Sequence, residues 1–313
     1  MPTKPILVTG SHRSGTTWVG RMLAAAPSVM YIHELFNPTL ARKNRGICRI
    51  RFDSWFTYIS AANEQDYYQE IRQALELRYN LPAKLQTVRS RRALQRAIRE
   101  RNQFAQSRRE RARPLLKDPI AFFSAEWLAA RFAMDVVVLI RHPAAFAGSL
   151  KVKNWRFPFS HFLEQPLLME AYLHPYEAEI AQFAQKEQDI VDQAALLWKL
   201  IHYVILQFQQ KRPDWLFVRH EELSQNPAAG FRFLFTQLGL DYSAEAARTV
   251  QAHSAPGMAL LPANEDQLFT ALRRDSAANV WTWKERLTPA EIGRVRDRVA
   301  EISQAFYTET EWK

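Results

Sequence analysis

The sequence predicts an α/β protein in which helices cover both faces of a mainly parallel sheet, and three observations support this fold class. Short apolar segments alternate along the chain with longer segments that carry apolar residues at helical spacing. The first apolar segment runs into a glycine-framed loop and then into a helix, the order of a strand–loop–helix unit. A chain of 313 residues with 47% hydrophobic content can bury a full core. We therefore expect three layers, with the sheet in the middle.

The predicted strands are short apolar segments, each followed by polar residues or proline. They span residues 5–9, 29–33, 114–117, 135–140 and 215–219. The predicted helices are longer and span residues 18–26, 62–78, 84–112, 121–133, 176–211, 227–237 and 288–308. Long helical segments after the second and fourth strands indicate insertions that form a lid on a compact core.

The chain has no internal repeat or low-complexity linker, so the sequence predicts one domain over residues 1–313, with a basic helical insertion at about 62–113. Residues 254–280 are expected to form an extended loop. No apolar run approaches the ~18 residues of a membrane span, and the chain start leads into a strand without a signal segment. With a single cysteine, Cys48, an internal disulfide framework is excluded. These features predict a cytoplasmic protein.

The net charge of +10 is concentrated between Leu81 and Arg113. In this segment only Glu100 and Glu110 oppose eleven cations, and the apolar residues keep helical spacing, which predicts one or two amphipathic helices. The cations are Lys84, Arg89, Arg91, Arg92, Arg96, Arg99, Arg101, Arg108, Arg109, Arg111 and Arg113. Two interpretations stay open: a solvated basic face, or a surface that attracts an anionic ligand, a membrane surface or a polyanion.

Residues Gly10–Thr17, Gly-Ser-His-Arg-Ser-Gly-Thr-Thr, have the frame of a phosphate-binding loop. Backbone N–H groups and the N-terminus of the following helix would meet there and attract an anion. A nucleotide hydrolase has a lysine after the second glycine, but this chain has Thr16, and the cation of the loop is Arg13. We therefore expect a P-loop-like site that binds a phosphate-like anion without metal-assisted phosphoryl transfer.

A second anion site is predicted at the end of strand 135–140. Ligands of open α/β sheets bind beyond the carboxyl ends of strands, and Arg141 stands where a nucleotide hydrolase usually has a magnesium-binding Asp. Pro143 suits the first turn of a helix, and Ser149 lies about two helical turns after Arg141. Arg141 and Ser149 can bind a second phosphate. The two sites together predict a ligand with phosphate groups at both ends.

With these two sites the chain resembles sulfotransferases that use 3′-phosphoadenosine 5′-phosphosulfate (PAPS). The loop is similar to the Arg/Lys-Ser-Gly-Thr-Thr segment of that family, and Arg141 with Ser149 is similar to its 3′-phosphate site. The resemblance implies PAPS as co-substrate, no metal ion, and insertions on the acceptor side. The residues it implies at the 5′-phosphosulfate end are Arg13, Ser14, Gly15, Thr16, Thr17 and Trp18.

Two further stretches extend the resemblance to about residue 300. Phe217–Leu223, followed by Asn226 and Pro227, resembles the Arg-Tyr-Glu-Asp-Leu strand of the family and its following helix. Val280–Lys284, Val-Trp-Thr-Trp-Lys, resembles the segment that closes over the nucleotide, where an aromatic ring would stack on adenine. The nucleotide-binding residues implied here are Arg273, Arg274, Trp283 or Trp281, and Lys284.

Sulfonate transfer needs in-line positioning, stabilisation of charge on the leaving phosphate, and a base for the acceptor hydroxyl. The resemblance implies that Arg13 and the loop N–H groups stabilise the leaving group, and that Lys117 lies near the transferred group. Phenol-type cytosolic members have Lys-Thr-His-Leu-Pro at this strand end, with the histidine as base. Here Asp118 and then Pro119 stand at this position, so that histidine is absent.

Glu34 is the predicted base, because it resembles the glutamate that follows the second strand in carbohydrate- and tyrosine-modifying sulfotransferases. Burial among apolar residues is expected to raise its pKa enough for this role. His33 is the second candidate and Asp118 the third. The alternative for Glu34 is a structural pairing with Arg13 or Lys117.

The predicted function is transfer of sulfonate from PAPS to a hydroxyl of a carbohydrate, lipid or secondary metabolite, that is, a small-molecule or glycan acceptor. A P-loop kinase of a small molecule is the first alternative, disfavoured by Thr16 and Arg141. A non-catalytic protein that binds a nucleotide, or a polyanion through residues 84–113, is the second. The eight histidines lack metal-ligand spacing, so no metal is predicted. No specific nucleic-acid partner is expected, and the oligomeric state stays open.

Overall fold

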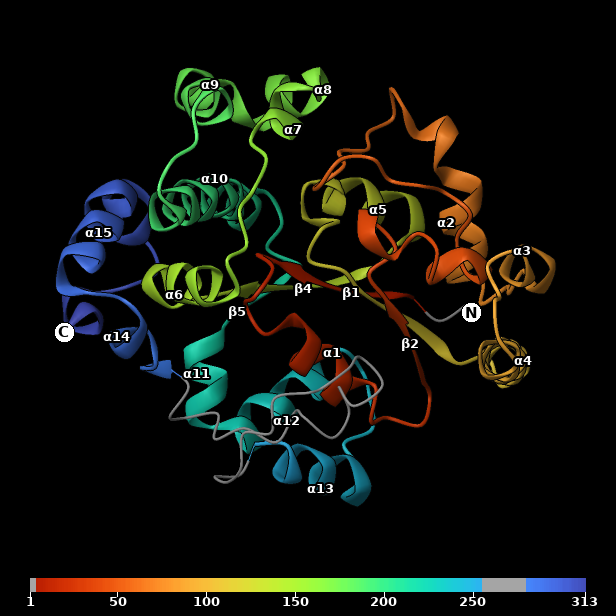
Figure 1. Ribbon diagram of the computed structural model, residues 1–313. Coiled ribbons are helices and arrows are strands. Elements are labelled where there is room, and N and C mark those ends of the chain that lie inside the picture. Colours follow the sequence, from red (N-terminus) through yellow and green to blue (C-terminus); the bar gives the residue numbers. More distant parts are fainter. Residues whose placement is uncertain (1–3, 255–279) are drawn as a thin grey trace. The chain divides into compact units, whose positions relative to one another are not determined.

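Five strands form one parallel sheet in the order β2-β3-β1-β4-β5, flanked by helices, in the computed structural model of residues 4–254 and 280–313 (Figure 1). The strands are β1 (Ile6–Gly10), β2 (Val29–His33), β3 (Arg113–Lys117), β4 (Asp135–Ile140) and β5 (Leu216–Arg219). The α/β fold class and all five predicted strands are therefore confirmed. Strands β1, β3 and β4 are buried almost throughout, β2 is buried at alternate residues, and β5 is only partly buried.

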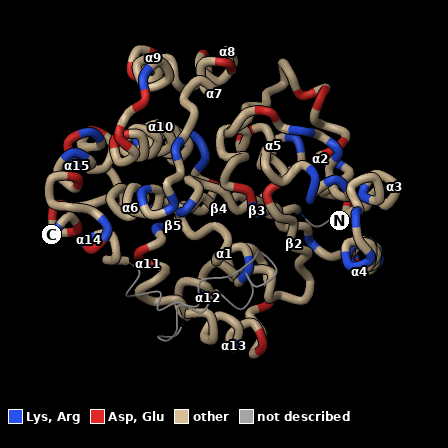
Figure 2. The backbone as a smooth tube through the Cα atoms, viewed as in Figure 1, with Lys and Arg blue, Asp and Glu red and all other residues tan. Residues whose placement is uncertain are grey.

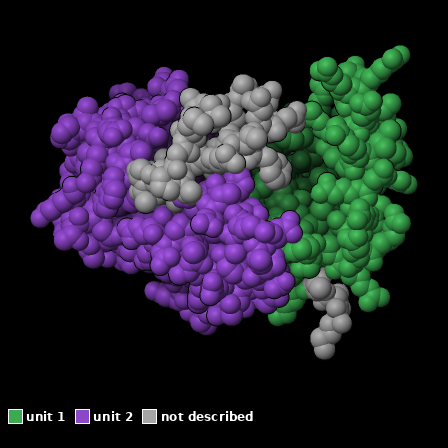
Figure 3. All heavy atoms as spheres, turned by 90° about the horizontal axis from the view of Figure 1, so that it is seen from below, with its two compact units in different colours: residues 1–9, 19–137 green, residues 10–18, 138–313 purple. Residues whose placement is uncertain are grey.

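The chain forms two compact units, shown in separate colours in Figure 3. Unit 1 comprises residues 1–9 and 19–137, and unit 2 comprises residues 10–18 and 138–313. Residues 10–18, which include the loop Gly10–Thr17, thus belong to unit 2, whereas residues 6–9 of β1 and residues 19–23 of α1 (Thr16–Leu23) belong to unit 1. That residues 1–313 act as one domain stays a prediction.

In unit 1, β3 pairs with β1 on one side and β2 on the other. Val8 of β1 and His33 of β2 both stand opposite Lys117, so the carboxyl ends of these three strands are level. Every residue of β3 is buried. The remaining helices of the unit are α2 (Tyr68–Leu75), α3 (Leu81–Leu85), α4 (Arg91–Arg109) and α5 (Ala125–Phe132). The sheet therefore presents one continuous edge at which polar side chains can gather.

The basic segment between Leu81 and Arg113 contains two helices, α3 and α4, and a polar side chain caps the N-terminus of each. Asn80 caps α3, accepting from the Ala83 N–H at 2.9 Å, and Ser90 caps α4, accepting from the Ala93 N–H at 3.2 Å. The helix predicted over 62–78 is shorter in the structure, because a 3-10 turn over Glu64–Asp66 precedes α2. Figure 2 shows blue Lys and Arg positions along α4.

Unit 2 contains the remaining helices. They are α6 (Pro143–Lys153), α7 (Ser160–Leu163), α8 (Pro166–Leu168), α9 (Glu177–Gln185), α10 (Ile190–Lys211), α11 (His220–Gln225), α12 (Pro227–Gln237), α13 (Ala244–Ala252), α14 (Trp283–Arg286) and α15 (Pro289–Ser303). Helix α6 contacts α10, α14 and α15.

The prediction of a single helix over 176–211 is wrong, because the extended backbone of Lys186 ends α9 and Asp189 caps α10. The loop predicted at 254–280 lies almost wholly outside the described residues. Within the described ranges, no helix combines the length and the apolarity that crossing a membrane requires.

Candidate active site

The loop between β1 and α1 is shaped by two glycines with positive φ, Gly10 at 123° and Gly15 at 93°. A Cβ on Gly10 would lie 2.3 Å from the Leu139 carbonyl oxygen, and one on Gly15 would lie 2.6 Å from His220 Nδ1. No side chain fits at either position, so both glycines are required by space as well as by conformation. Between them the Ser14 N–H donates to the Ser11 carbonyl at 3.2 Å, which closes a tight turn before α1.

Arg13, the cation of this loop, also has a left-handed backbone, with φ of 64°. Such a conformation is uncommon for arginine and concentrates at functional sites. Its Nε donates to Ser149 Oγ on α6 at 3.1 Å, and its carbonyl accepts from Arg141 Nη1 at the end of β4. The structure thus brings Arg13, Arg141 and Ser149 together within unit 2.

The backbone at the end of β4 is held from two sides. The Trp198 indole N–H donates to the Arg141 carbonyl at 2.8 Å, and buried Glu221 accepts from the His142 N–H at 2.9 Å. Glu221 in turn accepts from the Tyr307 hydroxyl at 3.0 Å. These contacts fix the peptide from which the Arg141 side chain extends.

In unit 1, Glu34 forms an ion pair with Lys117, whose side chain is 0% exposed. Glu34 has φ of 42°, a second left-handed backbone at a predicted site residue. Its free carboxylate oxygen accepts from Asn37 Nδ2 at 2.7 Å, and its carbonyl accepts from Asn44 Nδ2 at 2.8 Å. The structural alternative for Glu34, pairing with Lys117, is therefore present, and its geometry also leaves the carboxylate at the carboxyl edge of the sheet.

Burial by itself raises the pKa of Glu34, but the Lys117 ammonium and hydrogen bonds from Lys117 and Asn37 outweigh burial and hold that pKa at about 2. The expectation of a raised pKa is therefore wrong for this arrangement. The apolar residues beside Glu34 in the sequence indicated a raised pKa, whereas the pKa is lowered by Lys117 on the adjacent strand β3. Glu34 is ionised here and is only a weak base while Lys117 stays paired with it.

A sequence model of the sulfotransferase family matches residues 5–244, which is most of the chain. The chain belongs to the sulfotransferase family. A member of this family is a transferase, and the activity that follows from membership is transfer of a sulfonyl group. Among curated protein sequences none matches this one significantly.

Solved structures show that this sulfotransferase shares its fold with other members. The sulfotransferase domain from the curacin biosynthetic pathway superposes with a TM-score of 0.51 at 15% identity, covering 96% of this chain and 98% of that one. Sulfotransferase STF9 from Mycobacterium avium gives 0.46 at 15% identity, over 99% and 78% of the two chains. Mouse sulfotransferase SULT7A1, complexed with PAP, gives 0.46 at 12% identity, over 99% and 88%.

The two other base candidates, His33 and Asp118, each form hydrogen bonds within unit 1, and their catalytic roles stay predictions. Burial, followed by the positive charge of Lys117, lowers the pKa of His33 to about 3, and its Nδ1 shares a hydrogen bond with the Tyr31 hydroxyl at 3.1 Å. Asp118 accepts from the backbone N–H groups of Phe36, Ile120 and Ala121 at 2.8, 3.0 and 3.3 Å. Both oxygens of Asp118 thus bind the turns that follow β2 and β3.

Three of the predicted nucleotide-binding side chains make contacts within the protein, and their nucleotide-binding roles stay predictions. Trp18 is buried against Phe231, with ring centroids 5.0 Å apart. Trp283 is 1% exposed and one face of its ring stacks on His142, with ring centroids 5.1 Å apart. Lys284 donates to the Lys313 carbonyl at 2.7 Å.

The remaining predicted residues divide into two groups. Trp281 is 41% exposed and keeps the adenine-stacking role as a prediction. Arg273 and Arg274 lie outside the described residues. Ser14, Thr16 and Thr17 follow the loop into the first turn of α1, where helix N–H groups lack intrahelical partners. Their roles, like those of Arg13, Arg141 and Ser149, stay predictions about the donor.

Sequence reasoning missed the residues that hold this site. Asn37, Asn44 and Trp198 act on backbone or carboxylate groups of the predicted residues, but no local motif marks them. Glu221 could have been identified from the sequence, because it lies in the Phe217–Leu223 motif. Its side chain is buried and accepts from the His142 N–H, which explains why a carboxylate is needed in that motif.

Proposed function

We propose that this sulfotransferase transfers the sulfonate group of PAPS to a hydroxyl of a small-molecule or glycan acceptor by in-line displacement. The observation that carries the proposal is the meeting of Arg13, Arg141 and Ser149, side chains from both predicted phosphate sites. Guanidinium groups beside a helix N-terminus suit a donor with several phosphate and sulfate charges. Thr16 instead of a lysine, and Arg141 instead of a magnesium ligand, favour sulfonate transfer over a kinase reaction.

In the proposed reaction the acceptor oxygen attacks sulfur, the bond between sulfur and the bridging oxygen breaks, and adenosine 3′,5′-bisphosphate leaves. The acceptor proton passes to the Glu34 carboxylate. Negative charge that develops on the bridging oxygen is stabilised by Arg13 and by the loop N–H groups. No divalent ion takes part in this proposal. Within the described residues no group of three His, Cys, Asp or Glu is placed to hold a metal ion.

Lys117 is proposed to exchange partners during the reaction. It is the register neighbour of Val8, and the phosphate loop begins two residues after Val8 in the chain. When a sulfonate oxygen takes the Lys117 ammonium, Glu34 loses the charge that lowers its pKa. Burial then dominates and raises that pKa, so the carboxylate becomes a better base once the donor is bound.

The first test is a thermal-shift comparison of nucleotides. We expect adenosine 3′,5′-bisphosphate to stabilise the protein without magnesium, and ATP with magnesium to have a smaller effect at equal concentration. Stabilisation by magnesium–ATP alone would contradict the proposal and favour a kinase. Transfer from labelled PAPS to a panel of sugars, lipids and aromatic alcohols then identifies the acceptor class.

The cytoplasmic location of the protein stays a prediction.

A further inference from the structure

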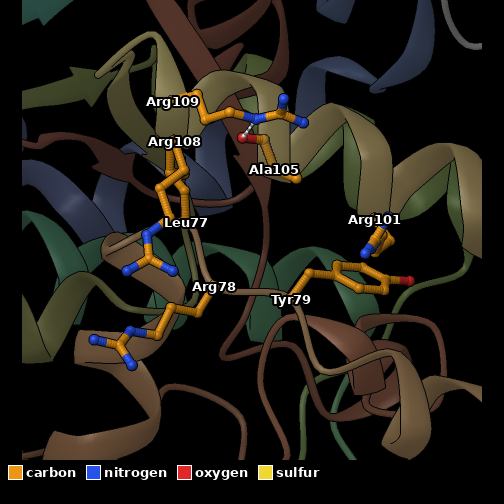
Figure 4. Close-up of a pocket in the computed structure, with 7 residues that line it drawn as sticks. All are labelled: Leu77, Arg78, Tyr79, Arg101, Ala105, Arg108 and Arg109. Atoms are coloured by element: carbon orange, nitrogen blue, oxygen red, sulfur yellow. Dashed lines mark hydrogen bonds between the residues drawn. The ribbon is translucent and has the colours of Figure 1, made fainter.

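A basic hollow of about 560 Å³ lies in unit 1 between α4 and the segment that follows α2. Figure 4 shows the residues that line it as sticks: Leu77, Arg78, Tyr79, Arg101, Ala105, Arg108 and Arg109. Four of these are arginines and none is acidic. The volume falls in the range of ordinary ligand sites. None of the residues assigned to PAPS or to sulfonate transfer lines it.

We propose that this hollow is a second anion site, which binds a molecule bearing several sulfate or phosphate esters. Arginine suits such groups because its planar guanidinium donates two parallel hydrogen bonds to an oxyanion. The apolar lining by Leu77 and Ala105 and the ring of Tyr79 suit the carbon frame that carries the esters.

The charge of the hollow is poorly neutralised by the protein itself. Arg78 pairs with Glu76 at 2.8 Å, whereas Arg101 donates to Asn102 Oδ1 and Arg109 to the Ala105 carbonyl. Within the described residues, Arg101, Arg108 and Arg109 form no ion pair with a carboxylate. Their mutual repulsion is relieved when an anion binds, which adds to the affinity of a polyvalent ligand.

The walls of the hollow are held in place by contacts within unit 1. Leu77, with φ of 54°, ends α2 in a turn closed by the Arg78 N–H donating to the Gln73 carbonyl at 2.9 Å. The Tyr79 hydroxyl donates to Glu100 at 2.8 Å, and its ring packs against Phe104 with centroids 5.5 Å apart. A fixed hollow favours a compact polyanion over a nucleic acid, because Tyr79 is the only aromatic residue that lines it and its ring is already packed.

The test compares two triple variants with equal loss of charge. The first, Arg101→Gln with Arg108→Gln and Arg109→Gln, removes the α4 arginines that line the hollow. The second, Arg92→Gln with Arg96→Gln and Arg99→Gln, removes exposed arginines from the opposite side of the same helix, given 100° per residue. The affinities of the unmodified protein and of both variants for sucrose octasulfate and for inositol hexakisphosphate are measured by calorimetric titration. Adenosine 3′,5′-bisphosphate is present at a saturating concentration to occupy the donor site.

We expect the first variant to lose about tenfold or more in affinity for the probe that binds more tightly, and the second about threefold or less. The tighter probe shows whether sulfate or phosphate esters are preferred. Equal losses in both variants, or no binding of either probe by the unmodified protein, would overturn the proposal. So would a single-stranded oligonucleotide that binds more tightly than both probes.

The result is independent of the proposed function. Arg141→Ala should weaken binding of adenosine 3′,5′-bisphosphate and leave octasulfate or hexakisphosphate binding unchanged, whereas the hollow variant should do the reverse. Circular dichroism and thermal midpoints of all variants confirm that they fold.

Discussion

The two groups of candidate site residues, one in each unit, differ in how their charged side chains are paired. In unit 2, Arg13 and Arg141 meet neutral oxygens, the Ser149 hydroxyl and the Arg13 carbonyl. In unit 1, the Lys117 ammonium meets the Glu34 carboxylate in a buried ion pair. In the proposed function the first group binds the anionic donor. The second group acts on substrate only after its ion pair has exchanged partners.

This difference suggests a division of labour, with binding energy coming from unit 2 and a protonation change in unit 1. Both groups share one feature, since Arg13 and Glu34 each have a left-handed backbone in the loop that follows a strand. Such conformations persist only where surrounding contacts hold them. For Glu34 these contacts come from Asn44 and from Lys117, whose carbonyl accepts from the Glu34 N–H at 2.9 Å.

Glu34→Gln tests the proton-transfer role most directly and has the largest expected effect. Transfer from PAPS should fall by about 10²–10⁴-fold, the usual contribution of a general base. Binding of adenosine 3′,5′-bisphosphate, measured by calorimetry, should change little. Glu64→Gln, which removes a partly buried carboxylate that pairs with Arg131 and accepts from the Trp127 indole N–H, is the matched control. Turnover equal to that of the control would remove Glu34 from the mechanism.

Lys117→Met tests the buried ion pair. It leaves the Glu34 carboxylate without its cation, which should lower the free energy of unfolding by about 3–5 kcal/mol in urea titrations near neutral pH. The double variant Lys117→Met with Glu34→Gln removes both charges and should recover much of that loss, although it stays inactive. A double variant no more stable than the single one would show that the lysine contributes by packing instead.

The fold was largely predictable because its signals are local. Each strand is a short apolar run with clear ends, and α12 begins at the predicted residue because Asn226 caps it and Pro227 follows. The break between α9 and α10 was missed because residues 186–189 contain neither glycine nor proline. The Asp189 cap was a usable signal.

The site was predictable where a motif defines it and not where distant segments meet. Gly10 and Gly15 are required by close backbone and side-chain approaches that the loop motif implies. The pKa of Glu34 depends on Lys117, 83 residues away on the neighbouring strand, so no local pattern gives its direction. Asn44 lies in an irregular segment, and its hold on Glu34 could not be deduced from spacing.

Arg141→Ala tests the proposed donor-binding role of the unit 2 residues. Loss of one charge-assisted contact should weaken binding of adenosine 3′,5′-bisphosphate by about 2 kcal/mol, or about 30-fold. Because Lys117 is fully buried in its ion pair with Glu34, stability should fall less in Arg141→Ala than in Lys117→Met. Arg156→Ala, at an exposed ion pair with Glu187, controls for net charge. Unchanged affinity would place the 3′-phosphate elsewhere.

Asp118→Asn has the smallest expected effect and separates a structural carboxylate from a catalytic one. The amide keeps one acceptor oxygen but turns an NH₂ group toward a backbone donor, which should cost about 1 kcal/mol, the low end for one unsatisfied buried group. Transfer activity of the folded variant should be nearly unchanged.

The pH dependence of Asp118→Asn gives a sharper test than its stability at one pH. Burial raises the pKa of Asp118 to about 7, although backbone N–H groups oppose the rise. The folded protein therefore holds a proton that the unfolded chain releases near pH 4, and this residue stabilises the fold fully below pH 4 and progressively less up to pH 7. The unfolding free-energy difference between the parent and Asp118→Asn, measured in urea at intervals over this window, should shrink as pH rises. A difference that is constant or grows with pH would mean that the N–H groups of Phe36, Ile120 and Ala121 keep Asp118 ionised in the folded state, as in an ordinary turn-capping carboxylate.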